Sequence, residues 1–220
     1  MRKLNIIALL FITVNTFGQA HYIGIQGGGL FSNQTSEDFL TDTEYRKGFS
    51  TGINYEYLVS KNYTIRSGVI FNQKGFIISS DLRDPYGNTI GETEMLFNYS
   101  YLSIPVKAGY NTGNKLKGFA NIGISSNILL YAKHISPAFE VNGTQYKKET
   151  VDVKDQVSSL SLSGLAELGA SYMIADMELF TSIQYVHDIT TFSNEDYFKN
   201  AKFRHFAFTF SIGLKYALIK

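Results

Sequence analysis

Charged side chains recur on the polar face of segments whose residues alternate between large apolar and small or polar types. These positions are Glu56, Arg66, Lys74, Lys107, Glu167, Glu178 and Lys215. A row of such groups inside a membrane protein could carry ions or protons. Both signs are present, however, and a buried charge needs a partner. The pattern therefore favours a structural charge network in a narrow interior over a conduction path.

Reactive constellations are scarce in the sequence. The pair His187-Asp188 hints at a hydrolase, but no nucleophile motif accompanies it and serine is common along the chain. The other three histidines are scattered without metal-ligand spacing. The glycine run at 27–29 precedes no helix, so close strand packing explains it better than a phosphate loop. We therefore expect no catalytic residue, no cofactor and no metal site.

The charged residues lie in eight segments with period-two alternation, the pattern of β-strands with unlike faces. The last segment is the clearest, because Phe206, Phe208, Phe210, Ile212, Leu214 and Tyr216 alternate with small or polar residues. Each segment has at least the ~9–11 residues that a tilted membrane-spanning strand needs. The segments cover residues 21–31, 47–59, 63–77, 95–110, 116–131, 158–173, 176–189 and 204–218.

The connections between these segments alternate in length. Three are short, whereas the connections at 32–46, 78–94, 132–157 and 190–203 are long and polar. Short turns at one end and long loops at the other are typical of outer-membrane barrels. Five tyrosines on the apolar face lie at the short-turn ends of their strands, as expected for an aromatic girdle on the periplasmic side of the membrane. They are Tyr57, Tyr63, Tyr110, Tyr172 and Tyr216.

Turn lengths predict the strand register. A three-residue turn at 60–62 pairs residues symmetrically about Lys61, which puts Glu56 opposite Arg66, close enough for an ion pair inside the barrel. A two-residue turn at 174–175 puts Tyr172 opposite Met177. The dipeptide at 142–143, Asn-Gly, is typical of a hairpin turn and predicts that its long loop extends as two strands.

The first residues have the composition of a secretory signal. Arg2 and Lys3 precede the short apolar stretch 4–14, and small residues at 16 and 18 fit a cleavage site after residue 18, with a second site after residue 20. The stretch is too short for a membrane-spanning helix, and a buried N-terminal helix is the alternative. We expect a signal peptide over 1–18 and one barrel domain over 19–220.

Composition excludes several other classes. The 220-residue chain carries a net charge of +1, so nothing draws it to nucleic acid. It has no cysteine, which rules out disulfides and thiolate chemistry. With 15 Tyr, 17 Phe, 19 Gly and only 3 Pro, it suits many paired strands in close contact.

Four stretches carry a resemblance to a known family: IGIQGGGLFSN (23–33), GVIFNQKG (68–75), YLSIPVKAGY (101–110) and FTFSIGLKY (208–216). Of these, YLSIP is the most specific, because proline inside a strand is unusual. The chain resembles the Bacteroidetes PorT-like, or outer membrane protein beta-barrel domain, family. The resemblance implies an eight-stranded outer-membrane barrel and carries no activity with it.

The predicted fold class is therefore all-β: an eight-stranded antiparallel up-and-down transmembrane barrel with both termini in the periplasm of a Gram-negative cell. We expect a monomer that is surrounded by outer-membrane lipid and has a structural or binding role, with an extracellular ligand or protein at the four long loops. Two alternatives stay open. One is an outer-leaflet lipid-modifying enzyme that uses His187, and the other is a secreted, lipocalin-like ligand-binding barrel.

Overall fold

The computed structural model describes residues 20–36, 43–83, 86–139, 145–194 and 202–219. The predicted signal peptide lies outside these residues, apart from the possible cleavage position at Ala20. The described residues form nine strands and one short 3-10 helix, η1 (Lys154–Gln156). The strands are β1 (His21–Ser36), β2 (Thr43–Leu58), β3 (Tyr63–Arg83), β4 (Thr89–Gly113), β5 (Leu116–Phe139), β6 (Gln145–Asp152), β7 (Leu160–Ile174), β8 (Met177–Asp188) and β9 (Phe203–Ile219).

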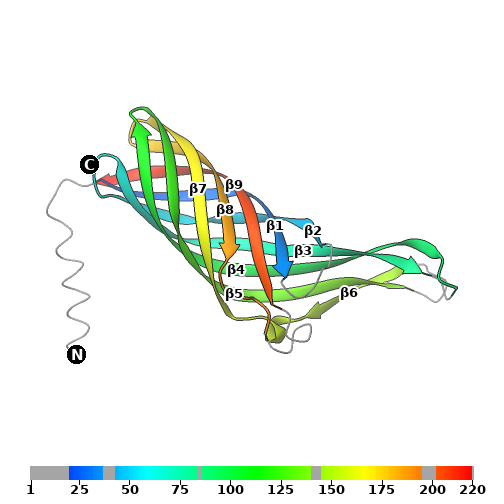
Figure 1. Ribbon diagram of the computed structural model, residues 1–220. Helices are drawn as coiled ribbons and strands as arrows, with labels where there is room; N and C mark the ends of the chain where they lie inside the picture. The colour runs from blue at the N-terminus through cyan, green and yellow to red at the C-terminus, as the bar shows by residue number, and fades with distance from the viewer. Residues whose placement is uncertain (1–19, 37–42, 84–85, 140–144, 195–201, 220) are drawn as a thin grey trace, which may run out of the picture.

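Eight strands form a closed antiparallel ring in the order β1-β2-β3-β4-β5-β7-β8-β9 (Figure 1). Pairing of β9 with β1, from His21↔Ile219 to Ser36↔Phe203, closes the ring. This confirms the predicted up-and-down barrel, and each predicted segment is one strand of it. The ninth strand, β6, pairs only with the outer part of β5 and stands outside the ring. Among the described residues no helix is long and apolar enough to cross a membrane.

Side chains alternate between the two faces along most of the barrel wall. On β9, Phe210 is 50% exposed and Ser211 only 6%. The same contrast holds around the ring, where large apolar residues such as Ile53, Ile122 and Leu168 face outward. A soluble barrel would turn its large apolar residues inward, so this arrangement suits a barrel whose outer face meets lipid.

One end of the barrel carries three short turns, at residues 59–62, 114–115 and 175–176, together with the start of β1 and the end of β9 (Figure 1). We call this the short-turn end. The last turn corrects the sequence prediction, because Ile174 pairs with Met177 and Tyr172 with Leu179. The turn is therefore Ala175-Asp176, and Ala175 has a φ of 54°, the sign that tight hairpin turns require at their first central position. Since the register moves by two residues, every side chain keeps its predicted face.

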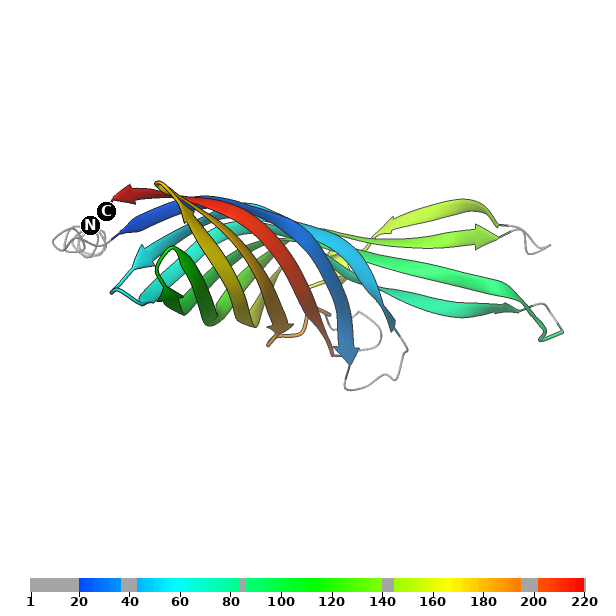
Figure 2. The same cartoon turned by 90° about the horizontal axis from the view of Figure 1, so that it is seen from above.

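The opposite end, which we call the hairpin end, carries two long hairpins, β3–β4 and β5–β6 (Figure 2). The predicted loops at 78–94 and 132–157 are therefore largely strands. Pairing of β3 with β4 continues out to Arg83↔Thr89, and pairing of β5 with β6 to Phe139↔Gln145. The two strands predicted from the Asn-Gly dipeptide are present, although the dipeptide itself lies outside the described residues.

Candidate functional site

All seven charged residues predicted on the polar face lie inside the barrel, where each is between 2% and 8% exposed. Glu56 and Arg66 are direct cross-strand partners, which is the register that the short turn predicts. The Nε of Arg66 lies 3.1 Å from Oε2 of Glu56. From across the interior, Lys215 donates to the same Oε2 at 2.7 Å. The Glu56 carboxylate thus contacts two cations.

The network continues through Lys215, whose Nζ also lies 2.7 Å from Oε1 of Glu178. The other oxygen of Glu178 accepts a hydrogen bond from Lys117 at 2.9 Å. A neighbouring pair joins Lys107 to Glu167 at 2.7 Å. Lys117 was not predicted as a member, although it is the second residue of β5, directly after the short turn at 114–115. The contacts linked through Lys215 join β2, β3, β5, β8 and β9 in the short-turn half of the barrel, and the Lys107–Glu167 pair joins β4 to β7.

Inward aromatic rings separate these charges and fill the space around them. The guanidinium of Arg66 lies 4.3 Å from the ring centre of Phe119, and the ammonium of Lys215 lies 5.5 Å from that of Phe180. Each ring lies over an inward glycine. A Cβ on Gly169 would come within 2.3 Å of Phe119, and one on Gly213 within 2.4 Å of Phe180. The charged network is therefore packed as tightly as a protein core.

The remaining predicted charge, Lys74, is paired nearer the hairpin end. Its Nζ donates to Oδ1 of Asp188 at 3.2 Å, and Ser163 donates to the same oxygen at 2.6 Å. His187 points the other way and lies 3.3 Å from the hydroxyl of Tyr185 on the outer face. The dipeptide that hinted at hydrolysis is thus divided between the two faces of the wall. Its acidic member serves as the partner of a buried lysine.

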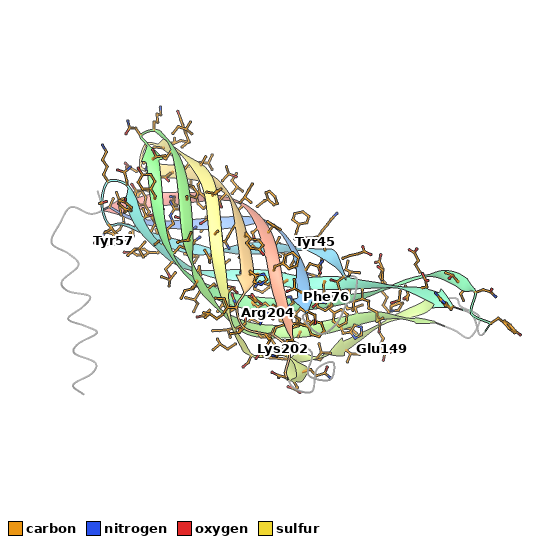
Figure 3. The ribbon with its side chains drawn as sticks, in the orientation of Figure 1. Tyr45, Tyr57, Phe76, Glu149, Lys202 and Arg204 are labelled. Carbon is orange, nitrogen blue, oxygen red and sulfur yellow. The ribbon has the colours of Figure 1, made fainter. Side chains whose placement is uncertain are left out.

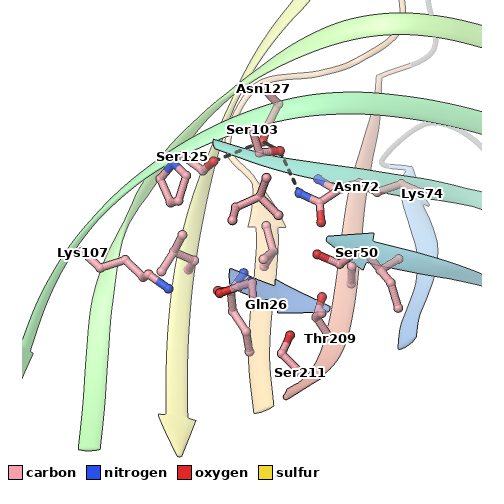
Figure 4. A pocket seen from close by; sticks show the side chains of 17 residues that line it. Gln26, Ser50, Asn72, Lys74, Ser103, Lys107, Ser125, Asn127, Thr209 and Ser211 are labelled. Carbon is pink, nitrogen blue, oxygen red and sulfur yellow. Dashed lines mark hydrogen bonds between the residues drawn. The ribbon is translucent and has the colours of Figure 1, made fainter. Parts of the chain in front are cut away.

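A small cavity of about 30 Å³ lies between Lys74 and Lys107 (Figure 4). Hydrogen bonds run along its wall from Asn72 to Ser103 at 2.9 Å and from Ser103 to Asn127 at 2.7 Å. A water needs roughly 10–15 Å³ of such space, so the cavity has room for a few waters. A second cavity, of about 20 Å³, adjoins the Glu56–Arg66 pair. Among the described residues the interior is therefore filled by side chains, with no open bore.

An aromatic cluster closes the hairpin end of the interior, and we call it the aromatic plug. Phe192, from the connection after β8, is fully buried and stacks on His205 with ring centres 3.8 Å apart. The sequence analysis missed this plug. Part of it could have been found from the inner-face positions on β3 and β4, but nothing in the sequence indicates that the connection folds inward. The plug consists of Phe76, Phe97, Tyr99, Tyr101, Leu129, Ala132, Val153, Val157, Phe192, Phe203 and His205.

The five predicted tyrosines lie on the outer wall near the short-turn end, and Figure 3 labels Tyr57 there. Tyr63 and Tyr110 are cross-strand partners whose rings meet edge to face at 5.4 Å. The ammonium of Lys115 lies 5.3 Å from the ring centre of Tyr172. No group of three or more His, Asp or Glu side chains in the described ranges could hold a metal ion.

The comparisons with known proteins agree with this geometry. The model of the family described as "Outer membrane protein beta-barrel domain" matches residues 17–220. No curated protein matches the sequence.

Several solved structures are similar to the chain at low sequence identity. The Neisserial surface protein A is 15% identical with a TM-score of 0.49, and the match covers 91% of this chain and 99% of that one. The outer membrane protein OprG from Pseudomonas aeruginosa is 12% identical with a TM-score of 0.47, covering 91% and 97%. The outer membrane protease OmpT from Escherichia coli is 9% identical with a TM-score of 0.47, covering 93% and 99%. The family model matches residues 17–220, and the strands form a closed ring whose outer face is apolar. The chain therefore belongs to the outer membrane protein beta-barrel domain family and is a small barrel of the outer membrane.

Proposed function

We propose that this barrel binds an extracellular partner through the sheet formed by its two long hairpins, and that it acts as a monomer. One observation carries the proposal: β3–β4 and β5–β6 continue as ordered strands beyond the ring, while the ring itself is filled. A sheet that protrudes beyond the ring does not help a barrel to cross the membrane. It can serve instead as a surface that contacts another molecule.

Transport and catalysis have weaker support in the interior. The two interior cavities hold only a few waters, and the aromatic plug lies between them and the hairpin end. Each of the seven predicted charges has an ion-pair partner, which favours a structural network over an ion path. His187 lies beside the hydroxyl of Tyr185 on the outer face, whereas Asp188 forms an ion pair with Lys74 on the inner face. The two residues therefore do not form one catalytic site.

The orientation follows from the same proposal. The short turns and both termini would face the periplasm, and the hairpins would face the outside. The outward tyrosines at the short-turn end support this, because such rings suit the membrane interface. A cleaved signal peptide over residues 1–18 fits this route of export. The four stretches that resemble PorT-like barrels of Bacteroidetes support membership of that subgroup.

The experiment compares cells that express the full chain with cells that express a shortened variant. In the variant, a short turn joins Phe76 to Phe97 and another joins Ala132 to Val153, which removes the hairpins and keeps the ring. Heat-modifiable gel migration checks that both barrels fold. We expect only the full chain to retain members of a panel of immobilised extracellular proteins. Equal binding of every panel member by both strains would overturn the proposal, as would stable single-channel conductance of the purified barrel.

A further inference from the structure

Strands β4 and β5 separate at the base of the two hairpins. Their pairing runs along the barrel wall and ends at Leu96↔Ile135. Beyond that point β4 continues through residues 89–95 with only β3 beside it, and β5 continues through 136–139 with only β6 beside it. Figure 2 shows the two hairpins diverging toward their tips. We call the space between them the fork.

Both walls of the fork are open sheet edges. A strand that is paired on one side presents unpaired N–H and C=O groups on its other side, and such an edge is a template for another strand. In most proteins an open edge faces solvent alone. Here two open edges face each other across one gap, so a strand would be paired on both sides where the diverging edges are two strand spacings, or about 9–10 Å, apart. The resulting sheet would run continuously from β3 to β6.

The fork also contains a groove of about 580 Å³. Its floor is apolar, because Ile77, Leu96 and Ile135 are successive cross-strand partners on one face of the sheet. Its β4 wall is acidic, because Glu92 and Glu94 lie on the same face and are both exposed. Among the described residues neither of these carboxylates has an ion-pair partner.

Nearby acidic groups strengthen the negative charge of that wall. Glu92 lies opposite Asp81, and Glu94 lies opposite Ser79, which donates to the carboxylate of Glu44 at 2.6 Å. On the other side of the groove the lining charge is Lys148, one strand beyond β5. Basic side chains on an inserted strand would therefore be drawn toward the β4 wall.

We propose that the fork binds an extended basic peptide segment of the partner protein, which adds as a strand between β4 and β5. The proposal rests on the proposed function and names the form of its ligand. The shorter wall spans four residues, or roughly 14 Å at about 3.4 Å per residue. About four or five residues of the peptide would then contact both walls.

The direction and sequence pattern of the peptide follow from the two edges. The β4 edge is the longer one, and the β5 edge includes Pro137, which has no N–H. Antiparallel pairing with β4 is therefore favoured. In that direction the peptide starts at the base, where an apolar residue packs on the floor formed by Leu96 and Ile135, and the second and fourth residues after it meet Glu94 and Glu92. The pattern is apolar-x-basic-x-basic.

The test uses the full chain in lipid nanodiscs and a fluorescent peptide that contains Ile-Thr-Lys-Thr-Lys, with anisotropy as the readout. We expect saturable binding that weakens at least about fivefold in the double variant Glu92→Lys/Glu94→Lys, since two cross-strand charge contacts reverse sign. The same variant should gain affinity for the peptide with glutamates in place of the lysines. Glu149→Lys is the matched control, because this exposed residue of β6 does not line the groove, and it should stay within twofold of the wild type.

A peptide that is N-methylated at alternate amides separates strand addition from simple charge attraction. It keeps every side chain but loses main-chain donors, so we expect its binding to disappear. Undiminished binding of this peptide would overturn the proposal, and so would equal weakening by Glu149→Lys or an absence of binding to the wild type. If the hairpin-shortened cells lose panel binding while the double variant binds the peptide as the wild type does, the proposal of a peptide in the fork is overturned. The proposal that the hairpins bind a partner is then kept. If shortened and full-length cells bind alike, surface binding fails, and the peptide titration alone decides whether the fork binds strands.

Discussion

Replacing Glu56 with glutamine should destabilise the barrel more than replacing its partner Arg66. Glu56 is 4% exposed and contacts two cations, Arg66 at 3.1 Å and Lys215 at 2.7 Å. Its removal leaves Arg66 with the side chain of Asn111 at 3.2 Å and the ring of Phe119, but with no carboxylate within ion-pair distance among the described residues. A buried guanidinium without a counter-charge is costly.

The magnitude depends on what remains after each substitution. Breaking a buried ion pair from one side costs about 3–5 kcal/mol, and Glu56→Gln should fall near the lower end because Lys215 keeps Glu178 at 2.7 Å. Arg66→Gln should cost only about 1–3 kcal/mol, since Glu56 keeps Lys215. The double variant should cost less than the sum of the two, with a coupling of about 1 kcal/mol or more.

The assay is guanidinium unfolding of the barrel in lipid vesicles. The chain has no tryptophan, so circular dichroism and heat-modifiable gel migration report folding. Asp81→Asn is the matched control, because it breaks the exposed pair Asp81–Arg83, whose side chains are 51% and 63% exposed, and such pairs contribute about 0–1 kcal/mol. Strictly additive losses, or a larger loss for Arg66→Gln than for Glu56→Gln, would refute the reasoning.

Three further outcomes are expected from the packing. Phe210→Arg places a cation on the outer wall, where Phe210 is 50% exposed, and should cost about 2–4 kcal/mol of folding into vesicles; Phe210→Leu should fold normally, and equal folding of both would contradict the facing. Gly213→Ala should cost about 1–3 kcal/mol by crowding, and adding Phe180→Leu should restore part of the loss if the ring is the obstacle. Phe192→Ala removes a fully buried ring from the plug and should speed protease cleavage near residue 192 while the barrel stays folded; unchanged cleavage would show that the ring does not hold this connection in place.

Much of the ring could be predicted because its determinants are local. A strand with one lipid face and one packed face must alternate with period two, and a slip of one residue would invert every side chain. Short turns then fix the partner of each residue, as with Glu56 and Arg66. The turn predicted at 174–175 lies one residue later, at 175–176, which shifts the pairing register by two residues. Either dipeptide can form a tight turn, and the alternation of faces is unchanged by a register shift of two.

The hairpin end was harder to predict because its determinants are not local. The alternation of apolar and polar side chains continues in β3 and β4 beyond the ring. It is weaker there, because neither face meets lipid. These residues were therefore predicted as polar loops. The plug depends on Phe192, which lies in a connection and packs against aromatic rings from β3, β4 and β9. Likewise, Asp188 pairs with Lys74, which is 114 residues away in the sequence. No motif or spacing in the sequence predicts this ion pair.

The aromatic plug and the fork lie on opposite faces of the same part of β4 and β5. The plug can therefore hold in place the strand edges that line the fork. Phe97 stacks on His134 with ring centres 4.5 Å apart on the inner face, while their chain neighbours Leu96 and Ile135 form the floor of the groove on the other face. Because β4 and β5 stay paired from the short-turn end to this base, with one register shift between Ser100 and Tyr101, the barrel wall sets where they part. A binding site performs best when rigid elements hold its first contacts in place. The filled interior therefore supports the two hairpins.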